Sequence, residues 1–255
     1  AVFSRNSEHA IGHADPRHDA AAKVAGREQY ASDYYPEHLL WLGVRRSDQV
    51  HARIRGIDTA AAAQVPGVVA VLTHRDIRGT NRVGLPEWDE PVLCDDKVRH
   101  RGDAVALVLA ESNETLREAL PRVRVDYEIL EPVLDPERAL EPGSPRVHED
   151  APHGNILLQG AITSGGGAAA LAACDVVARG SFALSWQEHA YLETECGVAW
   201  MEADGTLVIV ASTQTPFRDR IEVAASLGLE QSKVRIIAPH LGGGFGGKDG
   251  ITVQA

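Results

Sequence analysis

The residues best placed to hold an anionic group lie near the end of the chain, in the segment LGGGFGGKDG at 241–250. Gly242, Gly247 and Lys248 match the frame of a nucleotide P-loop. Gly242, Gly244 and Gly247 also match the G-x-G-x-x-G of a dinucleotide site. Both patterns place backbone N–H groups around a phosphate. The segment therefore indicates a loop of backbone donors, and the residues around it must indicate the ligand.

Neither nucleotide pattern continues as its chemistry requires. The residue after a P-loop lysine is ordinarily a Ser or Thr that binds magnesium, but here it is Asp249, whose carboxylate would repel phosphates. A dinucleotide loop opens a βαβ unit with an acidic residue about 20 residues further on, and only five residues follow Gly250. Dense glycine permits close approach of the backbone to a ligand. We expect a cradle of N–H groups for an anionic or oxo group, with a ligand-free glycine turn as the alternative.

The composition narrows the class of protein. The 255 residues include 36 Asp and Glu against 25 Lys and Arg, a formal net charge of -11, which argues against a nucleic-acid partner. Apolar runs such as AVALVLA (104–110) are too short to span a bilayer, and the N-terminus carries no signal-peptide core. We therefore expect no membrane partner and a cytoplasmic location.

The metal-binding residue types are sparse. Cys94, Cys174 and Cys196 are widely spaced, which indicates free thiols in a reducing compartment. No histidine pair has H-E-x-x-H spacing. We expect that the chain holds no iron–sulfur cluster or structural zinc of its own and ligates no metal directly through a side chain.

The first half of the chain predicts a small unit of strands and helices. A short helix is expected after Asp58, a second after Ser112 or Asn113, and residues 75–100 are expected to form a long loop. The expected strands are 39–44, 68–73, 103–111 and 123–130, the last with period-2 alternation. This order predicts a compact α+β unit.

A second region is expected after the five prolines in residues 131–155. SGGGAAALAACDVVARGSF predicts a glycine turn, a short helix and a strand. Asp204-Gly205 predicts the turn of a hairpin between two strands. TPFRDRIEVAASLGL predicts a helix that ends near Gly228, and KVRIIAP predicts a strand leading into the glycine loop.

Three segments in this order resemble the molybdenum hydroxylases, the xanthine dehydrogenase and aldehyde oxidase family. They are WQEHAYLETE (186–195), ASTQTPFRDR (211–220) and GGGFGGK (242–248). Upstream, KVAGREQYASD (23–33) and GDAVALVLAES resemble the family's hammerhead domain, so the resemblance covers roughly residues 15–255. It implies an α+β fold, in which a hammerhead-type α/β domain precedes the start of a mixed α/β molybdopterin-binding domain.

The resemblance also implies a domain plan. The expected parts are an N-terminal arm (1–22), a hammerhead-type domain (23–135), a linker (136–155) and an incomplete molybdopterin-binding domain (156–255). A whole molybdenum subunit of this family is much longer, and the rest of it would carry the glutamate base and most pterin contacts. We therefore expect the chain to need a partner that continues the fold, through an apolar interface of more than about 2,000 Å².

The chemistry implied by the resemblance is oxidation of an aldehyde or of an N-heterocycle such as xanthine, with water as the oxygen source. A molybdenum–molybdopterin cofactor, plain or as the cytosine dinucleotide, would carry it. Electrons would pass to [2Fe–2S] clusters and FAD in partner domains or subunits. The expected partners are the remainder of the molybdenum subunit, an iron–sulfur subunit, a FAD subunit and a small-molecule substrate.

Two residues match family positions beside the metal and the substrate. Gln187 matches a glutamine whose amide can donate to the molybdenum oxo ligand, a catalytic and cofactor-binding role. Phe245 matches a phenylalanine of the active-site wall, where a ring can pack on a planar substrate and lie beside the cofactor. Outside the resemblance, the alternatives are a surface glutamine and a core aromatic residue.

The remaining matches lie in the glycine loop. Gly243, Gly244 and Gly246 match backbone that lies against the metal–pterin site. Asp249 matches a substrate-contacting glutamate of the purine-oxidising members and is one methylene shorter, which argues against a purine substrate. Lys248 is expected to be a structural ion-pair partner. The resemblance also implies structural or second-layer roles for Glu193 and Glu195.

Two other functions stay open from the sequence. One is a catalytically silent structural or assembly module of the same fold, which the missing half of the subunit favours. The other is a P-loop-type nucleotide-binding protein that uses Lys248. Calorimetric measurement of ATP or NAD binding would decide this last interpretation, and we expect no binding.

Overall fold

The computed structural model describes residues 17–250 of the chain. Its backbone divides into two compact units, which are described separately. The first unit comprises residues up to Leu39, Val83–Trp88 and the chain from His189 onward. The second unit comprises Leu40–Arg82 and Asp89–Glu188.

The second unit contains two antiparallel sheets of three strands. One sheet has the order β1-β5-β3, with β1 at Trp41–Arg46, β5 at Ala104–Ala110 and β3 at Val68–Thr73. The other has the order β4-β2-β6, with β4 at Lys97–Val98, β2 at Ala52–Asp58 and β6 at Arg124–Ile129. β5 is the central strand of the first sheet, in agreement with its continuous apolar sequence AVALVLA.

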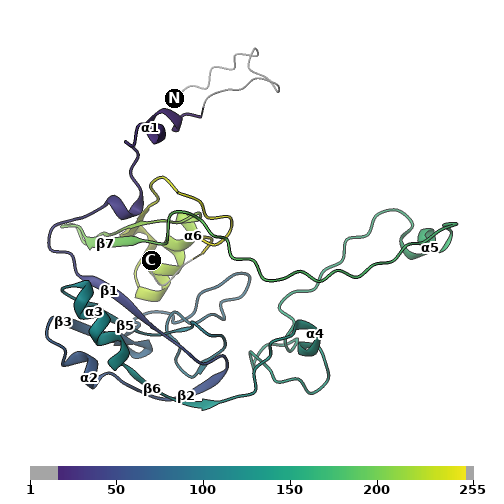
Figure 1. The fold of residues 1–255 in the computed structure, drawn as a ribbon, viewed down its shortest axis with the longest axis horizontal. Helices are drawn as coiled ribbons and strands as arrows, with labels where there is room; N and C mark the ends of the chain where they lie inside the picture. The colour runs from purple at the N-terminus through teal and green to yellow at the C-terminus, as the bar shows by residue number, and fades with distance from the viewer. Residues whose placement is uncertain (1–16, 251–255) are drawn as a thin grey trace. The chain divides into compact units, whose positions relative to one another are not determined.

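Two short helices cover the first sheet of this unit. α2 spans Ala60–Ala63 and α3 spans Asn113–Ala119, and both lie beside β3 and β5 (Figure 1). The hydroxyl of Ser112 caps α3 by accepting a hydrogen bond from the Thr115 N–H at 3.1 Å. Val108 of β5 and Leu116 of α3 belong to the same buried cluster, so burial of apolar surface joins helix and sheet.

The proline-rich segment is fastened to the second unit. It contains α4, at Pro136–Ala139, which the Asp135 carboxylate caps. The buried ammonium of Lys97 donates to both carboxylate oxygens of Glu149, at 2.9 and 3.0 Å. The Asn155 side chain bonds three backbone groups of the same segment. Residues 136–155 therefore have fixed contacts, and the expected domain boundaries remain a prediction.

Residues 156–188 are exposed over nearly their whole length. Their one helix is α5, at Gly167–Ala172, as the sequence predicts. The strand expected directly after it is wrong, because residues 173–183 form no strand in the described part of the chain. A strand needs a neighbour to pair its backbone groups, and this stretch has none among residues 17–250.

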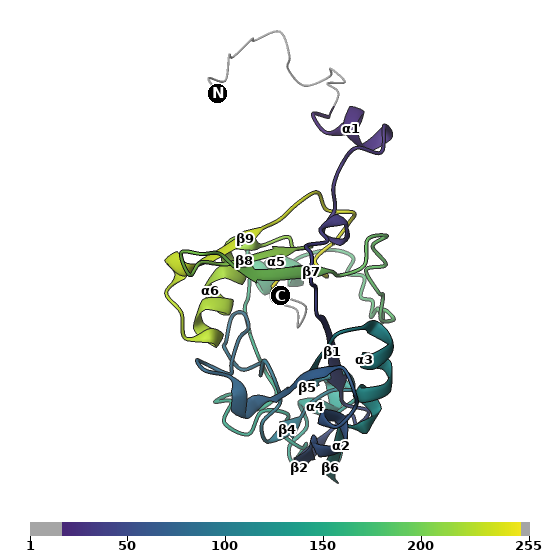
Figure 2. The ribbon, with the colours of Figure 1, turned by 90° about the vertical axis from the view of Figure 1, so that its left-hand side faces the viewer.

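The first unit is built on a three-stranded sheet of order β7-β8-β9. Its strands are β7 at Gly197–Met201, β8 at Leu207–Ala211 and β9 at Val234–Ile237, and its helices are α1 at Ala20–Val24 and α6 at Pro216–Leu227. β7 and β8 are antiparallel, and β8 and β9 are parallel with α6 as the crossover. Figure 2 shows α6 along one side of this sheet, where Val223 and Ala224 pack against Ile209.

Most of the expected elements are confirmed, including the hairpin at Asp204-Gly205 and the end of α6 at Gly228, which has φ 66°. The sequence pattern did not predict β2, nor the two-residue strand β4, which lies within the long loop expected at residues 75–100. A bulge shifts the register between Ile54 and Gly56, so the apolar residues do not keep period 2. The expected arm at 1–22 lies largely outside the described residues, and α1 begins within its end.

Candidate functional site

The glycine loop (residues 241–250) follows β9 and is the last described part of the first unit (yellow in Figure 2). It is anchored by Lys248, whose side chain is buried, with the residue 1% exposed. The ammonium donates to the Ser212 hydroxyl at 2.6 Å, to the Glu193 carboxylate at 3.1 Å and to the Glu193 carbonyl at 2.8 Å. Lys248, Glu193 and Ser212, here called the lysine network, thus join three separate segments of the chain.

The charges of the lysine network compensate each other. Burial raises the pKa of Glu193, but hydrogen bonds from the Gly242 N–H at 2.8 Å, from Lys248 and from Ser212 outweigh it and hold that pKa below its usual value. The ammonium also lies 4.5 Å from the centre of the Tyr191 ring. Lys248 is therefore an ion-pair partner, as expected, and its charge is neutralised inside the protein.

Gln214 forms three hydrogen bonds with the backbone of the glycine loop. Its amide oxygen accepts hydrogen bonds from the N–H groups of Gly246 at 3.0 Å and Lys248 at 3.3 Å. Its backbone N–H donates to the Lys248 carbonyl at 2.9 Å. A Cβ atom at Gly244 would lie 2.3 Å from the amide oxygen. Gly244 is thus required by the close approach of a side chain, independently of any ligand.

The hydrogen bonds of the loop leave three successive donors unused. The N–H of Gly247 donates to the Gly244 carbonyl, and that of Asp249 donates to the Gly246 carbonyl. The N–H of Gly250 donates to the Thr215 hydroxyl at 3.0 Å. Among residues 17–250, no acceptor bonds the N–H groups of residues 243–245. Of the backbone N–H groups expected to bind a ligand, only those of Gly243, Gly244 and Phe245 are therefore available in the described part of the loop.

Phe245 stands out in backbone and side chain. Its φ of 52° lies in the left-handed region, which costs a residue with a Cβ about 1–2 kcal/mol. Phe245 is also 75% exposed, so burial of its ring does not compensate for that cost. Strain of this kind is a reason to infer a functional constraint.

Asp249 and Gln187 are both exposed. Asp249 lies 3.8 Å from the Arg218 guanidinium. Gln187 belongs to the second unit, and its amide nitrogen donates to the Ser185 hydroxyl at 3.0 Å. The structure thus gathers Gly243, Gly244, Phe245, Gly246 and Asp249 in one loop, and the relation of Gln187 to that loop stays a prediction.

Sequence reasoning found the segments that hold the loop but assigned no role to Gln214 or Ser212. Their signal is weak, because both are polar residues within three positions of the end of β8 and no local pattern distinguishes them from ordinary loop residues. Only the fold brings them against residues more than 30 positions away.

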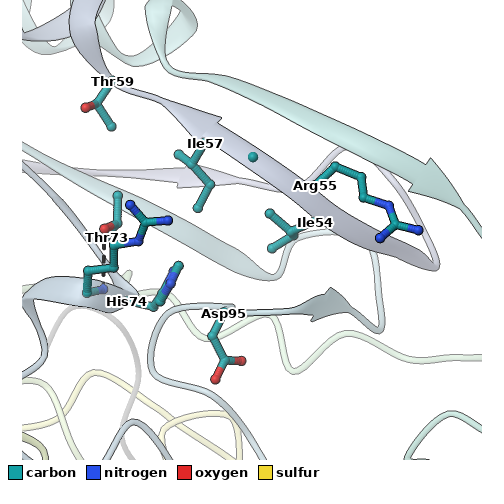
Figure 3. A pocket seen from close by; sticks show the side chains of 9 residues that line it. Ile54, Arg55, Ile57, Thr59, Thr73, His74 and Asp95 are labelled. Carbon is teal, nitrogen blue, oxygen red and sulfur yellow. Dashed lines mark hydrogen bonds between the residues drawn. The ribbon is translucent and has the colours of Figure 1, made fainter.

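A pocket of about 200 Å³ lies in the second unit, between β2 and the turn that carries Thr73 and His74 (Figure 3). Charged groups line it, but Arg55 is paired with Glu128, and Asp95 with Arg82 at 3.0 Å. None of the expected site residues lines this pocket.

The metal-binding side chains and the thiols are dispersed. Within residues 17–250, no group of three or more His, Cys, Asp or Glu side chains is arranged to hold a metal ion. Cys94, Cys174 and Cys196 are free thiols, and burial raises the pKa of Cys94. No helix in the same part of the chain has the length and apolar character needed to span a bilayer.

Two protein-family models match the chain. Residues 25–131 match the "Aldehyde oxidase and xanthine dehydrogenase, a/b hammerhead domain". Residues 147–255 match the "Molybdopterin cofactor-binding domain". The two matches follow each other in the order that the three sequence segments indicate.

Curated relatives have the same character. The nicotinate dehydrogenase large molybdopterin subunit of Eubacterium barkeri is 42% identical over 236 residues, which are 92% of this chain and 55% of the relative. A probable xanthine dehydrogenase subunit of Bacillus subtilis (strain 168) is 40% identical over 238 residues, 93% of this chain and 32% of the relative. The chain thus spans about half of the first relative and a third of the second.

Solved structures share the fold. Quinoline 2-oxidoreductase from Pseudomonas putida 86 superposes with a TM-score of 0.81 at 30% identity, over 93% of this chain and 31% of that chain. Aldehyde oxidoreductase from Desulfovibrio gigas gives a TM-score of 0.77 at 32% identity, over 88% of this chain and 26% of that chain.

A hammerhead domain followed by a molybdopterin cofactor-binding domain defines the class as molybdopterin-binding proteins. The chain belongs to the aldehyde oxidase and xanthine dehydrogenase family, the molybdenum hydroxylases. The expected family and fold class are therefore confirmed.

Proposed function

We propose that this chain forms one wall of a molybdenum–pterin site in an enzyme that hydroxylates an aldehyde or an N-heterocycle. The observation that carries the proposal is the run of unused N–H donors at Gly243, Gly244 and Phe245. Successive donors in a turn form a concave site for anionic or oxo groups. The lysine network and Gln214 fix the loop on both sides of these donors, at Gly242 and at Gly246 and Lys248.

The residues present fit a molybdenum–pterin group. The N–H groups of residues 243–245 have no acceptor among residues 17–250, and they could donate to the oxygen atoms of such a group. When bound, the group supplies a two-electron oxidation in which the carbon gains an oxygen from water. The residues of this chain that would face it are Gly243, Gly244, Phe245 and Gly246, with the Gln187 amide as a further donor.

For the substrate we propose contacts with Phe245 and Asp249. An exposed ring can stack on a planar heterocycle or pack on an aldehyde. The half-exposed Asp249 carboxylate can accept a hydrogen bond from a substrate N–H. Relatives and structural neighbours named for nicotinate, xanthine, quinoline and aldehydes support this substrate range.

The proposed partners are the remainder of the molybdenum subunit and the subunits that hold [2Fe–2S] clusters and FAD. The share of the relatives that the chain spans, 55% and 32%, supports the first of these. Exposed Phe182, Leu184 and Trp186 alternate with smaller residues, which is the pattern of a strand with one apolar face. A cytoplasmic location and the cytosine dinucleotide form of the pterin remain parts of the proposal.

The nucleotide-binding alternative does not fit the loop. A P-loop lysine offers its ammonium to phosphates, whereas the Lys248 ammonium is buried and bonded to Glu193 and Ser212. A phosphate could reach this group only after the lysine network is broken.

The origin of the inserted oxygen tests the proposed reaction. The complete assembled enzyme is given nicotinate or xanthine in water enriched in oxygen-18, with an artificial electron acceptor. Benzaldehyde exchanges its own oxygen with water, so for this compound only the formation of benzoate is measured. We expect one newly bound, labelled oxygen in hydroxylated nicotinate or xanthine, or oxidation of benzaldehyde. A hydroxylated heterocycle without label, or no oxidation of any of the three compounds by enzyme that contains molybdenum and pterin, contradicts the proposal.

A further inference from the structure

Arg218, in the first turn of α6, contacts the end of the glycine loop. Its guanidinium is held by Glu222 of the same helix, because the Nε atom donates to the buried Glu222 carboxylate at 3.1 Å. The Thr215 hydroxyl of the same turn accepts the Gly250 N–H at 3.0 Å. A Cβ atom at Gly250 would lie only 3.2–3.4 Å from three guanidinium atoms. Arg218 therefore packs closely on the backbone at Gly250.

The same guanidinium faces Asp249. Its Nη1 lies 3.8 Å from Oδ1 of the Asp249 carboxylate. The Arg218 side chain is three-quarters buried, and the Asp249 side chain is half exposed. At this distance the two groups form an ion pair without a hydrogen bond, and Glu222 restrains the Arg218 side of that pair. Oδ2 of Asp249 has no hydrogen-bond partner among residues 17–250 and is left for a ligand.

We propose that Arg218 is a positioning residue that holds the Asp249 carboxylate and so favours substrates that carry an N–H donor. This inference rests on the proposed function. A carboxylate offers acceptors only, so its position decides whether a heterocyclic N–H can reach it. A substrate without such a donor, such as benzaldehyde, gains nothing from the arrangement.

Kinetics of the complete enzyme separate this role from a general structural one. R218M removes the guanidinium, and R218M/E222Q also removes the buried charge that Arg218 neutralises, in case the single variant does not fold. We expect either variant to raise KM for xanthine about tenfold with kcat within about twofold. The reason is that a displaced Asp249 carboxylate would lose one charged hydrogen bond to the substrate N–H. For benzaldehyde, kcat/KM stays unchanged, and R218K restores part of the xanthine affinity.

Two controls sharpen the comparison. R235M removes an exposed arginine of the same unit, paired with Glu202 at 3.0 Å, and should leave both substrates unaffected. Because Arg218 acts through Asp249, R218M/D249N should be no worse than D249N alone. Additive losses, or equal losses with xanthine and benzaldehyde, overturn the proposal.

A crystal structure of the assembled R218M or R218M/E222Q enzyme tests the role of Arg218 even when neither xanthine nor benzaldehyde is oxidised. Absence of oxidation counts against the proposed function and not against the role of Arg218. We expect the Asp249 carboxylate to shift or lose order, with residues 242–248 unchanged. An Asp249 side chain that keeps its position overturns the role of Arg218, whatever the activity.

Discussion

The ammonium of Lys248 lies inside the first unit, bonded to Glu193 and Ser212. A charge in such a place is tolerated only when it is paired and hydrogen-bonded. In the lysine network the Lys248 ammonium is both paired and hydrogen-bonded. The same bonds leave it unable to bind a phosphate, although this lysine is the residue that made the loop resemble a nucleotide site. At the scale of the residue, the ion pair of Lys248 therefore decides that this glycine loop does not bind phosphate through its lysine.

Replacing Lys248 by methionine should destabilise the protein strongly. The change leaves the Glu193 carboxylate buried without its cation, which costs about 3–5 kcal/mol. Denaturant unfolding of the complete subunit measures the loss. K233M, which removes an exposed lysine bonded to the Asp204 carbonyl, is the control and should change little. K248M/E193Q should recover part of the loss, and equal stability of K248M and wild type would show that the network is unimportant.

Replacing Phe245 by alanine should impair substrate binding. The exposed, strained ring is the proposed wall of the substrate site, so its removal should raise KM at least tenfold, equivalent to about 1.4 kcal/mol. Phe217 of the same unit is also 75% exposed, which makes F217A a matched control. Steady-state kinetics of both variants give the answer. Equal effects of F245A and F217A would argue against a substrate contact.

The buried carboxylate of Asp219 should make stability depend on pH. Burial raises its pKa by more than the nearby Thr213 hydroxyl lowers it, and the neighbouring Glu222 carboxylate adds to the rise. The unfolded chain therefore loses this proton first, so stability falls as pH rises from about 3.9 through the folded pKa. D219N should be more stable than wild type at neutral pH, with the difference vanishing in acid. Thermal unfolding from pH 3 to 8 measures this, with the exposed D126N as control.

At the scale of the element, the glycine loop depends on the segment after β8. Gln214 occupies the space into which a Cβ at Gly244 would project, so loop and segment fit only while residue 244 is glycine. The Gln214 side chain also accepts hydrogen bonds from the N–H groups of Gly246 and Lys248, directly after the unused donors of residues 243–245. The conformation of the loop therefore depends on the segment after β8.

Substituting Gly244 by alanine should release the cofactor. The new Cβ would meet the Gln214 amide oxygen at 2.3 Å, so that the Gln214 side chain or the loop must move and the hydrogen bonds from Gln214 to the Gly246 and Lys248 N–H groups are disturbed. We expect the assembled G244A enzyme to lose most of its molybdenum and pterin, and G244A/Q214A to retain more because the clash is relieved. G160A is the control, since a Cβ there meets nothing within 4 Å. Full cofactor content in G244A would contradict this account of the loop.

The sequence predicted the elements with a clear period and failed where the period is broken. β5 and β3 are continuous apolar runs and α6 ends in glycine, so local sequence determines them. β2 escaped prediction because its bulge shifts the alternation. The loop was found from its glycines, but Gln214 and Ser212 were not, since their contacts arise only when β8 and β9 pair.

At the scale of the whole molecule, the exposed apolar side chains of residues 182–186 indicate a surface that a partner covers. Phe182, Leu184 and Trp186 are 92%, 96% and 97% exposed, and their spacing of two residues would place them on one face of a strand. Burying three such side chains is worth several kcal/mol, at about 1.5–3 kcal/mol each. The remainder of the molybdenum subunit is the proposed cover.

Hydrogen exchange tests this cover. In the complete enzyme, we expect the amides of residues 182–186 to exchange slowly, because the segment pairs as a strand and its apolar face is buried. The exposed turn at residues 141–144 is the internal comparison and should exchange fast. Equally fast exchange in both segments would mean that no partner strand covers residues 182–186.

The central claim is that the glycine loop is a wall of a molybdenum–pterin site, and the metal and pterin content of the complete enzyme tests it most directly. Purified enzyme is analysed for molybdenum, pterin, iron and flavin. The account predicts stoichiometric molybdenum and pterin in the wild type and their loss in G244A. An assembled enzyme that holds iron–sulfur clusters and flavin but neither molybdenum nor pterin would contradict it and favour a silent structural module.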